Sequence, residues 1–300
     1  MESIHKAVLL HEVVSGLVTR SDLVGCVNYL DCTIGGCGHA LAIAEALKGN
    51  LNIIGLDRDP RSIERAKVLL SGKAEKVILE NEDFRNLDKV LDKNEIKNVD
   101  LILMDLGLSS DQLQDSMRGF SFQADEPLLM TMNDPTKHLF NAGSIVNNWK
   151  EEDIANVIFA YGEERFARRI AKGIVEYREK KEIETSGELV EIIKMRVPAF
   201  YRRGKIHPAT KTFQALRIAV NDELNSLKEG LEKSYERLNI GGRMAVISFH
   251  SLEDRIVKNF YKEKANTKES IVTKKPVCAS LEEVRDNPRS RSAKLRIFQK

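Results

Sequence analysis

Three aspartates in the first 105 residues each follow a short apolar run, and they are the first candidates for chemistry. Asp31 follows Tyr29-Leu30, Asp57 follows residues 51–56, and Asp105 follows residues 99–104. Apolar runs of this length are typical of buried strands. Because ligands of open α/β sheets bind at the carboxyl ends of the strands, we expect the three carboxylates to converge on one binding crevice. One such aspartate could be only a helix cap, whereas three in succession indicate a site.

A glycine-rich turn follows the first of these aspartates. Glycines stand at positions 35, 36 and 38, and Ala, Leu and Ile then recur at helical spacing. The order predicts a strand, a tight turn and a helix, in which glycine lets the backbone approach a ligand and the helix presents N–H groups. Asp57 stands about 20 residues later, an offset at which an acid commonly binds the ribose of a nucleotide-like cofactor.

The glycine pattern alone does not identify that cofactor. Position 41 is leucine, so the Gly-x-Gly-x-x-Gly fingerprint of dinucleotide-binding proteins is not met. A turn without any ligand, an NAD site and an S-adenosylmethionine site all fit these residues.

A third predicted strand at residues 77–80 is followed by a loop that contains Asp83 and Phe84. In a parallel nucleotide-binding sheet this loop lies beside the base, where the acid could form a hydrogen bond and the ring could stack on an adenine. A polar loop with one buried phenylalanine fits the same pattern equally well.

The remaining elements follow from apolar periodicity. We expect a short amphipathic helix within residues 1–25, a helix from Ser62, a long helix from about Thr212 to Leu238, a turn at 239–242 and a fifth strand at 243–249. Ser251 is placed to cap the next helix, with Asp254 at the capping-box position. Alternation near the basic C-terminal end predicts a final edge strand.

Residues 112–203 differ from the rest because they contain no strand-like apolar run, so we expect a helical insertion between the fourth and fifth strands. Arg165, Arg168, Arg169 and Lys172 form a cationic run on one of its helices, and basic character peaks at residues 202–211. Such a run is either an ordinary solvated helix face or a helix that contacts phosphates.

Composition describes an ordinary globular protein: 300 residues, 42% hydrophobic, 31% charged and a net charge of +2. Any nucleic-acid surface must therefore be local. The four cysteines, at 26, 32, 37 and 278, form no CxxC pair, which argues against a zinc site or a disulfide framework. His5 and His11 lack partners at metal-ligand spacing and are expected to be surface or packing residues. No signal peptide is visible and no apolar run approaches membrane-spanning length, so we expect a cytoplasmic protein.

Six segments, in a fixed order, carry a resemblance to a known family: 30–33 with 38–39, 104–110, 118–122, 161–167, 207–215 and 247–255. With these segments the chain resembles the bacterial MraW/RsmH family, S-adenosylmethionine-dependent methyltransferases that act on cytidine N4 in the decoding region of small-subunit (16S) ribosomal RNA. The resemblance runs nearly from end to end.

The resemblance implies an α/β fold, a doubly wound Rossmann-like methyltransferase sheet with an inserted helical domain. The expected domains are residues 1–111 and 206–300 for the methyltransferase and 112–205 for substrate recognition. The implied partner is 16S ribosomal RNA within the small subunit or its precursor, with no membrane partner. No metal-binding residue is assigned, and the oligomeric state and the participation of a metal ion are left open. The family's cofactor positions fall on Cys37, Gly38, His39, Asp57, Phe84, Asp105 and Gln112.

The chemistry of such a reaction gives Asp105 a further role. Cytosine N4 is a poor nucleophile because its lone pair is delocalised into the ring, so methyl transfer depends on alignment and on an oxygen that accepts the amine N–H groups. Asp105, or a backbone carbonyl in residues 106–108, is placed to be that acceptor. The target base must leave its stack to reach the site.

Two departures from the family pattern bear on this interpretation. Cys37 stands where the family usually has glycine, so the backbone there must tolerate a side chain. The loop Glu126–Asn133 lacks an acid and an arginine that the family usually carries near the expected substrate entrance. Two alternative functions remain open. One is a nicotinamide-dependent oxidoreductase on the same sheet. The other is an RNA-binding assembly factor without turnover, which the altered loop favours.

Overall fold

The computed structural model describes residues 6–18, 25–108, 117–122, 125–136, 140–267 and 270–300. The chain divides into two compact units. The sheet unit comprises Met1–Ser109 and Leu224–Lys300, and the helical unit comprises Ser110–Glu223. The first boundary lies close to the expected one at 111, whereas the second lies at Glu223 instead of 205.

The sheet unit is built on six strands in the order β3-β2-β1-β4-β5-β6. Pairing is parallel from β3 to β5, and β6 pairs antiparallel with β5 at the edge, as predicted for the C-terminal strand. The order reverses between β1 and β4, which is the switch point where ligands of such sheets bind. The strands are β1 Val27–Asp31, β2 Leu51–Leu56, β3 Lys76–Glu80, β4 Val99–Asp105, β5 Leu238–Ser248 and β6 Lys294–Gln299.

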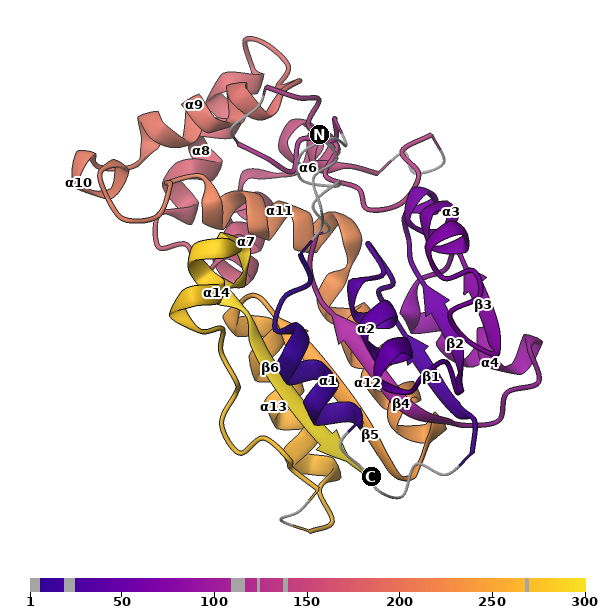
Figure 1. Ribbon diagram of the computed structural model, residues 1–300. Coiled ribbons are helices and arrows are strands. Elements are labelled where there is room, and N and C mark those ends of the chain that lie inside the picture. Colours follow the sequence, from indigo (N-terminus) through magenta and orange to yellow (C-terminus); the bar gives the residue numbers. More distant parts are fainter. Residues whose placement is uncertain (1–5, 19–24, 109–116, 123–124, 137–139, 268–269) are drawn as a thin grey trace. The chain divides into compact units, whose positions relative to one another are not determined.

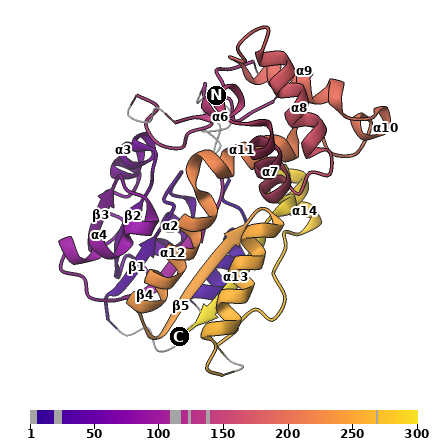
Figure 2. The ribbon, with the colours of Figure 1, turned by 180° about the vertical axis from the view of Figure 1, so that it is seen from behind.

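Helices cover both faces of this sheet, as Figures 1 and 2 show from opposite sides. One face packs against α1 Leu10–Val18, α2 Gly38–Ala46 and α3 Pro60–Leu69, and the other against α4 Leu87–Lys93, α12 Glu223–Arg237 and α13 Ser251–Lys264. In β4, Leu101 and Leu103 belong to the first core and Ile102 and Met104 to the second. Because successive side chains of a strand point to opposite faces, a strand buried on both sides is apolar throughout. The doubly wound α/β fold is confirmed.

The connections after the helical unit differ from the sequence-based expectations. The predicted long helix is two helices, α11 Thr210–Asn221 and α12, because Asp222 adopts a left-handed conformation at φ 50° that ends the first. The predicted turn at 239–242 lies inside β5, where a register shift against β4 absorbs the extra residues. The remaining short elements are η1 Phe84–Asn86, α14 Leu281–Asp286 and η2 Pro288–Ser292.

The described part of the helical unit contains six named helices: α6 Ala142–Asn148, α7 Glu151–Gly162, α8 Ala167–Arg178, α9 Ser186–Arg196, α10 Ala199–Arg202 and α11. Helix α11 packs closely on α7, since a side chain at Gly162 would meet the Lys211 carbonyl oxygen at 2.5 Å. This packing explains why residues 206–223 join the helical unit. Among the described residues, no helix has both the length and the apolarity required to cross a bilayer.

Candidate active site

The structure places Asp31, Asp57 and Asp105 at the same edge of the sheet. Asp31 pairs in register with Gly55 of β2 and with Leu103 of β4, so Asp57 and Asp105 each lie two residues beyond that level. Asp31 and Asp105 thus end their strands and Asp57 directly follows its strand, on three adjacent parallel strands, as their spacing predicted. Their surroundings differ, however, and these differences separate structural from chemical roles.

Asp31 is buried and holds the glycine-rich turn in place. One of its oxygens accepts the Tyr29 hydroxyl at 2.8 Å, and the other accepts the Thr33 N–H at 3.0 Å. Burial raises the pKa of Asp31 to about 6, against the hydrogen bonds that favour its ionised form. Asp31 therefore stabilises the chain between β1 and α2 rather than facing a ligand.

Asp57 ties the end of β2 to the same turn. Its carboxylate accepts the Gly35 N–H at 2.9 Å and the Asp59 N–H at 2.8 Å, and the Ser62 hydroxyl also bonds to it. Burial raises the pKa of Asp57 to about 6. A carboxylate has about four acceptor sites, so three donors leave room for one more.

The turn before α2 shows how the Cys37 side chain is accommodated and why position 38 is glycine. Cys37 caps α2 with φ 63°, a left-handed conformation that favours glycine and costs a residue with a side chain roughly 1–2 kcal/mol. Its side chain is nevertheless accommodated, fully buried, and burial raises the pKa of its thiol to about 12. A side chain at Gly38 would lie 2.9 Å from the Ala7 Cβ, so the segment before α1 requires glycine there.

His39 is buried on α2 and faces Asp105. Its Nε2 lies 2.9 Å from the Val8 carbonyl oxygen, so this nitrogen carries the hydrogen, and its Nδ1 lies 3.8 Å from Asp105 Oδ2. Burial lowers the pKa of His39, so the ring is neutral near pH 7. A neutral ring bonded in this way presents the Nδ1 lone pair toward the carboxylate, and the two acceptors together suit a group that carries N–H donors.

Backbone hydrogen bonds fix the position of Asp105 at the end of β4. Its N–H donates to Thr33 Oγ1 at 2.7 Å, and the next N–H, from Leu106, donates to the Ile247 carbonyl at 2.9 Å. Gly107 then passes close to Phe249, whose ring would lie 3.1 Å from a Cβ at that position. These contacts fix the end of β4 between the first turn and β5.

In the loop after β3, Phe84 packs against α12 and Asp83 binds neighbouring side chains. The Phe84 ring lies against α12, so closely that a Cβ at Gly230 would be 2.5 Å from it. The Asp83 carboxylate binds Arg58 at 2.6 Å, the Arg85 N–H at 3.0 Å and the Ser226 hydroxyl at 3.2 Å. Gln112, another expected cofactor residue, lies outside the described residues.

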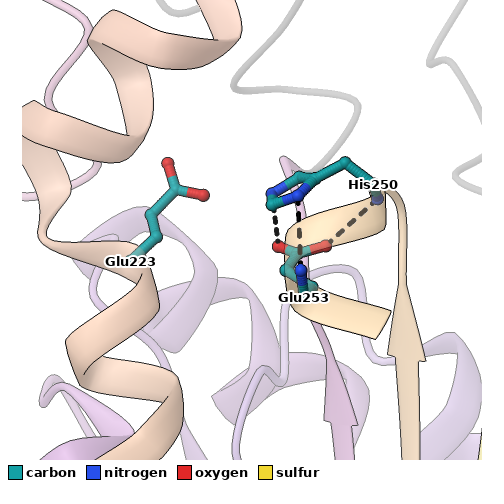
Figure 3. A group of neighbouring side chains, drawn as sticks. All are labelled: Glu223, His250 and Glu253. Carbon is teal, nitrogen blue, oxygen red and sulfur yellow. Dashed lines mark hydrogen bonds and ion pairs between the residues drawn. The ribbon is translucent and has the colours of Figure 1, made fainter. Parts of the chain in front are cut away.

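The start of α13 shows a cap that sequence reasoning placed one residue late. His250, not Ser251, is the cap: its Nδ1 accepts the Glu253 N–H at 3.4 Å, and Glu253 Oε2 accepts the Phe249 N–H at 2.8 Å. Figure 3 shows the imidazole next to the Glu253 carboxylate. The His250 Nε2 and Glu253 Oε1 atoms are 3.2 Å apart. The sequence contains a capping-box pattern at these positions, His-x-x-Glu, in which histidine takes the place of the usual Ser or Thr.

Asp254 and Glu223 each bind an arginine of their own unit. Asp254, expected in the capping box, instead binds Arg296 of β6 at 2.6 Å. Glu223, also drawn in Figure 3, belongs to the helical unit, where Arg217 donates two hydrogen bonds of 2.8 Å to its carboxylate.

In the helical unit, the altered loop Glu126–Asn133 is largely buried and has a packing role. The Glu126 carboxylate accepts the Gly119 N–H at 2.8 Å, and Arg118 donates to the Met132 carbonyl at 3.1 Å. Asn221 of α11 accepts the Met132 N–H at 2.7 Å. These contacts give the loop a structural function that its departure from the family pattern did not suggest.

The six segments that carried the resemblance gather into two groups. Residues 30–39, 104–108 and 247–255 meet at the sheet edge through the contacts above. Residues 118–122, 161–167 and 207–215 meet in the helical unit, where the Phe122 and His207 rings stack at 4.5 Å and Gln214 Nε2 donates to the Tyr161 carbonyl at 3.0 Å.

Comparisons with known proteins identify relatives that match this chain over almost its full length. A ribosomal RNA small subunit methyltransferase H from Sulfurihydrogenibium sp. is 49% identical over 98% of both chains. One from Brevibacillus brevis is 43% identical over 99% of this chain and 98% of that relative. Among solved structures, a putative methyltransferase from Streptococcus mutans in complex with SAH aligns with a TM-score of 0.45 at 11% identity, over 97% of this chain and 95% of that one. The sequence model of the MraW methylase family matches residues 2–300. The resemblance seen in the six segments is thereby confirmed over both units, and the chain belongs to the MraW methylase family.

Proposed function

We propose that this chain transfers the methyl group of S-adenosylmethionine to the exocyclic N4 of a cytidine in the decoding region of 16S ribosomal RNA. Membership of a methylase family, with full-length relatives named ribosomal RNA small subunit methyltransferase H, supports methyl transfer to small-subunit ribosomal RNA. The observation that carries the chemistry is the rigid placement of Asp105 at the switch point of the sheet, beside the neutral His39.

The sheet edge fits S-adenosylmethionine. When bound, this cofactor supplies an electrophilic methyl group. In our proposal the turn at Cys37, Gly38 and His39 lies against it, because α2 begins there and its first N–H groups have no partner within the helix. Asp57 accepts a ribose hydroxyl at its remaining acceptor site. Phe84 and Gln112 complete the proposed cofactor contacts.

Asp105 has the catalytic role in this proposal. Its carboxylate accepts an N–H of the target amine and orients the nitrogen lone pair toward the methyl group. As the nitrogen gains positive charge, the nearby anion stabilises that charge and can receive the proton. The bonds from Asp105 N–H to Thr33 and from Leu106 N–H to Ile247 keep this oxygen in position.

The helical unit is proposed to recognise the RNA, in place of the expected domain 112–205. Arg168, Arg169 and Lys172 of α8 are exposed, and so are Arg202 and Arg203. In the part of the chain that the structure describes, Lys172 is the only one of these five with a salt bridge, at 3.8 Å from Glu176. Exposed cations without acidic partners suit phosphates better than an internally neutralised helix face does.

The test is a methyl-transfer assay with isotopically labelled S-adenosylmethionine and unmethylated small ribosomal subunits. We expect label in 16S RNA, and digestion to nucleosides with mass spectrometry should identify N4-methylcytidine. NAD in parallel calorimetric titrations should not bind. Label in another nucleoside would contradict the N4 assignment, and binding to the subunits without methyl transfer would favour the assembly-factor alternative.

A further inference from the structure

An exposed aromatic ring projects from the helical unit. Phe200 is on the short helix α10, which extends beyond α8 and α9 in both Figure 1 and Figure 2. Its side chain is 65% exposed, so it contributes little to the core of its own unit. A large apolar ring held in water at this level is a candidate contact for a partner.

The residue after Phe200 fixes α10 in place. The Tyr201 hydroxyl donates to the carboxylate of Glu164, which is fully buried, and the Tyr201 ring packs edge-on against Phe166 at 5.0 Å. Burial and the neighbouring carboxylate raise the pKa of Tyr201, so the hydroxyl remains a donor at all ordinary pH values. Phe200 is therefore presented by a fixed support, which lowers the entropy lost when a partner binds.

A guanidinium group lies next to the exposed ring. Arg165 Cζ is 5.4 Å from the centre of Phe200, 4.8 Å from that of Phe166 and 5.2 Å from that of Tyr201. The arginine is exposed, and it makes no salt bridge with any described residue. Three rings thus hold an uncompensated cation beside Phe200.

We propose that Phe200 and Arg165 form a stacking site for one unpaired base of an RNA strand. Aromatic rings and arginine planes are the surfaces on which single-stranded bases stack, and only an unpaired base exposes its face. Arg169, Arg202 and Arg203 provide the charge complementarity for the adjoining phosphates. The inference rests on the proposed function, since it names the form of RNA that the helical unit binds.

The experiment compares Phe200→Ala with a matched control, Phe159→Ala. Phe159 of α7 is also 65% exposed, and no cation of the described residues lies over its ring. The probe is a short single-stranded RNA that contains 2-aminopurine, whose fluorescence falls on stacking, and a duplex RNA is titrated in parallel. We expect Phe200→Ala to weaken single-strand binding about tenfold and to abolish the fluorescence change. Phe200→Trp should restore both, and Phe159→Ala should behave as the wild type.

Several results would overturn the inference. Equal losses from Phe159→Ala and Phe200→Ala, or equal losses for duplex and single strand, would exclude a base-stacking site. Weaker binding to small ribosomal subunits without any change for the RNA probe would assign Phe200 to a protein partner instead.

Methyl transfer is measured in parallel so that the two proposals fail separately. If the base site exists, Phe200→Ala should raise KM for small subunits more than it lowers kcat. An inactive wild type would reject the proposed function, while the fluorescence titration would still decide whether Phe200 stacks on a base.

Discussion

Replacing Asp57 by alanine should weaken S-adenosylmethionine binding and also destabilise the sheet unit. The carboxylate accepts N–H groups from Gly35 and Asp59 and the hydroxyl of Ser62, so the substitution leaves three donors without their charged acceptor. Hydrogen bonds to charged groups contribute about 1.5–3 kcal/mol each. However, the pKa of Asp57 is raised to about 6 from 3.8 even with these hydrogen bonds in place, so at neutral pH the cost of burying the charge exceeds their gain by about 3 kcal/mol. The loss of unfolding free energy should therefore be well below the sum of the three hydrogen bonds, about 1–3 kcal/mol.

The expected loss of cofactor affinity comes from the remaining acceptor site. One charge-assisted hydrogen bond to a ribose hydroxyl contributes about 1.5–3 kcal/mol, which corresponds to roughly a 10- to 150-fold higher Kd. The affinity of the wild type should also depend on pH. Because the ionised carboxylate is the better acceptor, affinity should fall as the pH is lowered through about 6, and this part of the pH dependence should be absent in Asp57→Ala.

The assays are calorimetric titration with S-adenosylmethionine between pH 5 and 8, in steps of about one unit, and urea unfolding of the same proteins. Asp59→Ala is the matched control. Asp59 caps α3 two residues away, where it accepts the Arg61 N–H at 3.0 Å, and its loss should cost about 1 kcal/mol of stability without changing Kd. If Asp57→Ala binds the cofactor as tightly as Asp59→Ala does, Asp57 is only a structural tie and the ribose assignment is wrong.

Three other predictions concern the carboxylates and the cationic helix. Asp105→Asn removes the charge near the developing cation, so the single-turnover rate should fall about 10- to 1000-fold while cofactor affinity changes less. A large loss of cofactor affinity with a normal rate at saturation would instead make Asp105 a cofactor ligand only. Replacing Arg168 and Arg169 by glutamine should weaken RNA binding and lower the slope of log affinity against log salt concentration by about two, with cofactor affinity unchanged. Parallel losses of RNA affinity and cofactor affinity would indicate a structural role. Asp31 has a folded-state pKa of about 6 against 3.8, so its contribution to stability is present below pH 3.8 and lost as the pH rises through 6. Relative to Asp31→Asn, wild-type stability in urea should thus fall by up to about 3 kcal/mol between pH 4 and 7, and parallel curves would contradict this assignment.

Local patterns in the sequence were sufficient for much of the sheet unit. The strands that end at Asp31, at Asp105 and just before Asp57 were predictable because runs buried on both faces are apolar throughout. Their aspartates were expected at one edge because the carboxyl ends of parallel strands share it. The glycines of the first turn were readable for the same reason, since few other residues allow a tight strand-to-helix connection. Six segments in a fixed order were specific enough to indicate the family, which the comparisons then confirmed.

Contacts between distant residues decided the rest. Asp222 ends α11 in a left-handed conformation that helical periodicity does not encode, and packing on α7 assigns this helix to the helical unit. Asp31 and Asp57 looked alike in the sequence, and only their partners distinguish a buried turn support from a carboxylate with a remaining acceptor site. Arg165 and Phe200 are 35 positions apart in the chain, so their contact depends on the hydrogen bond between Tyr201 and the buried Glu164. Such pairings are invisible to local patterns because the energy that selects them arises only when the chain is packed.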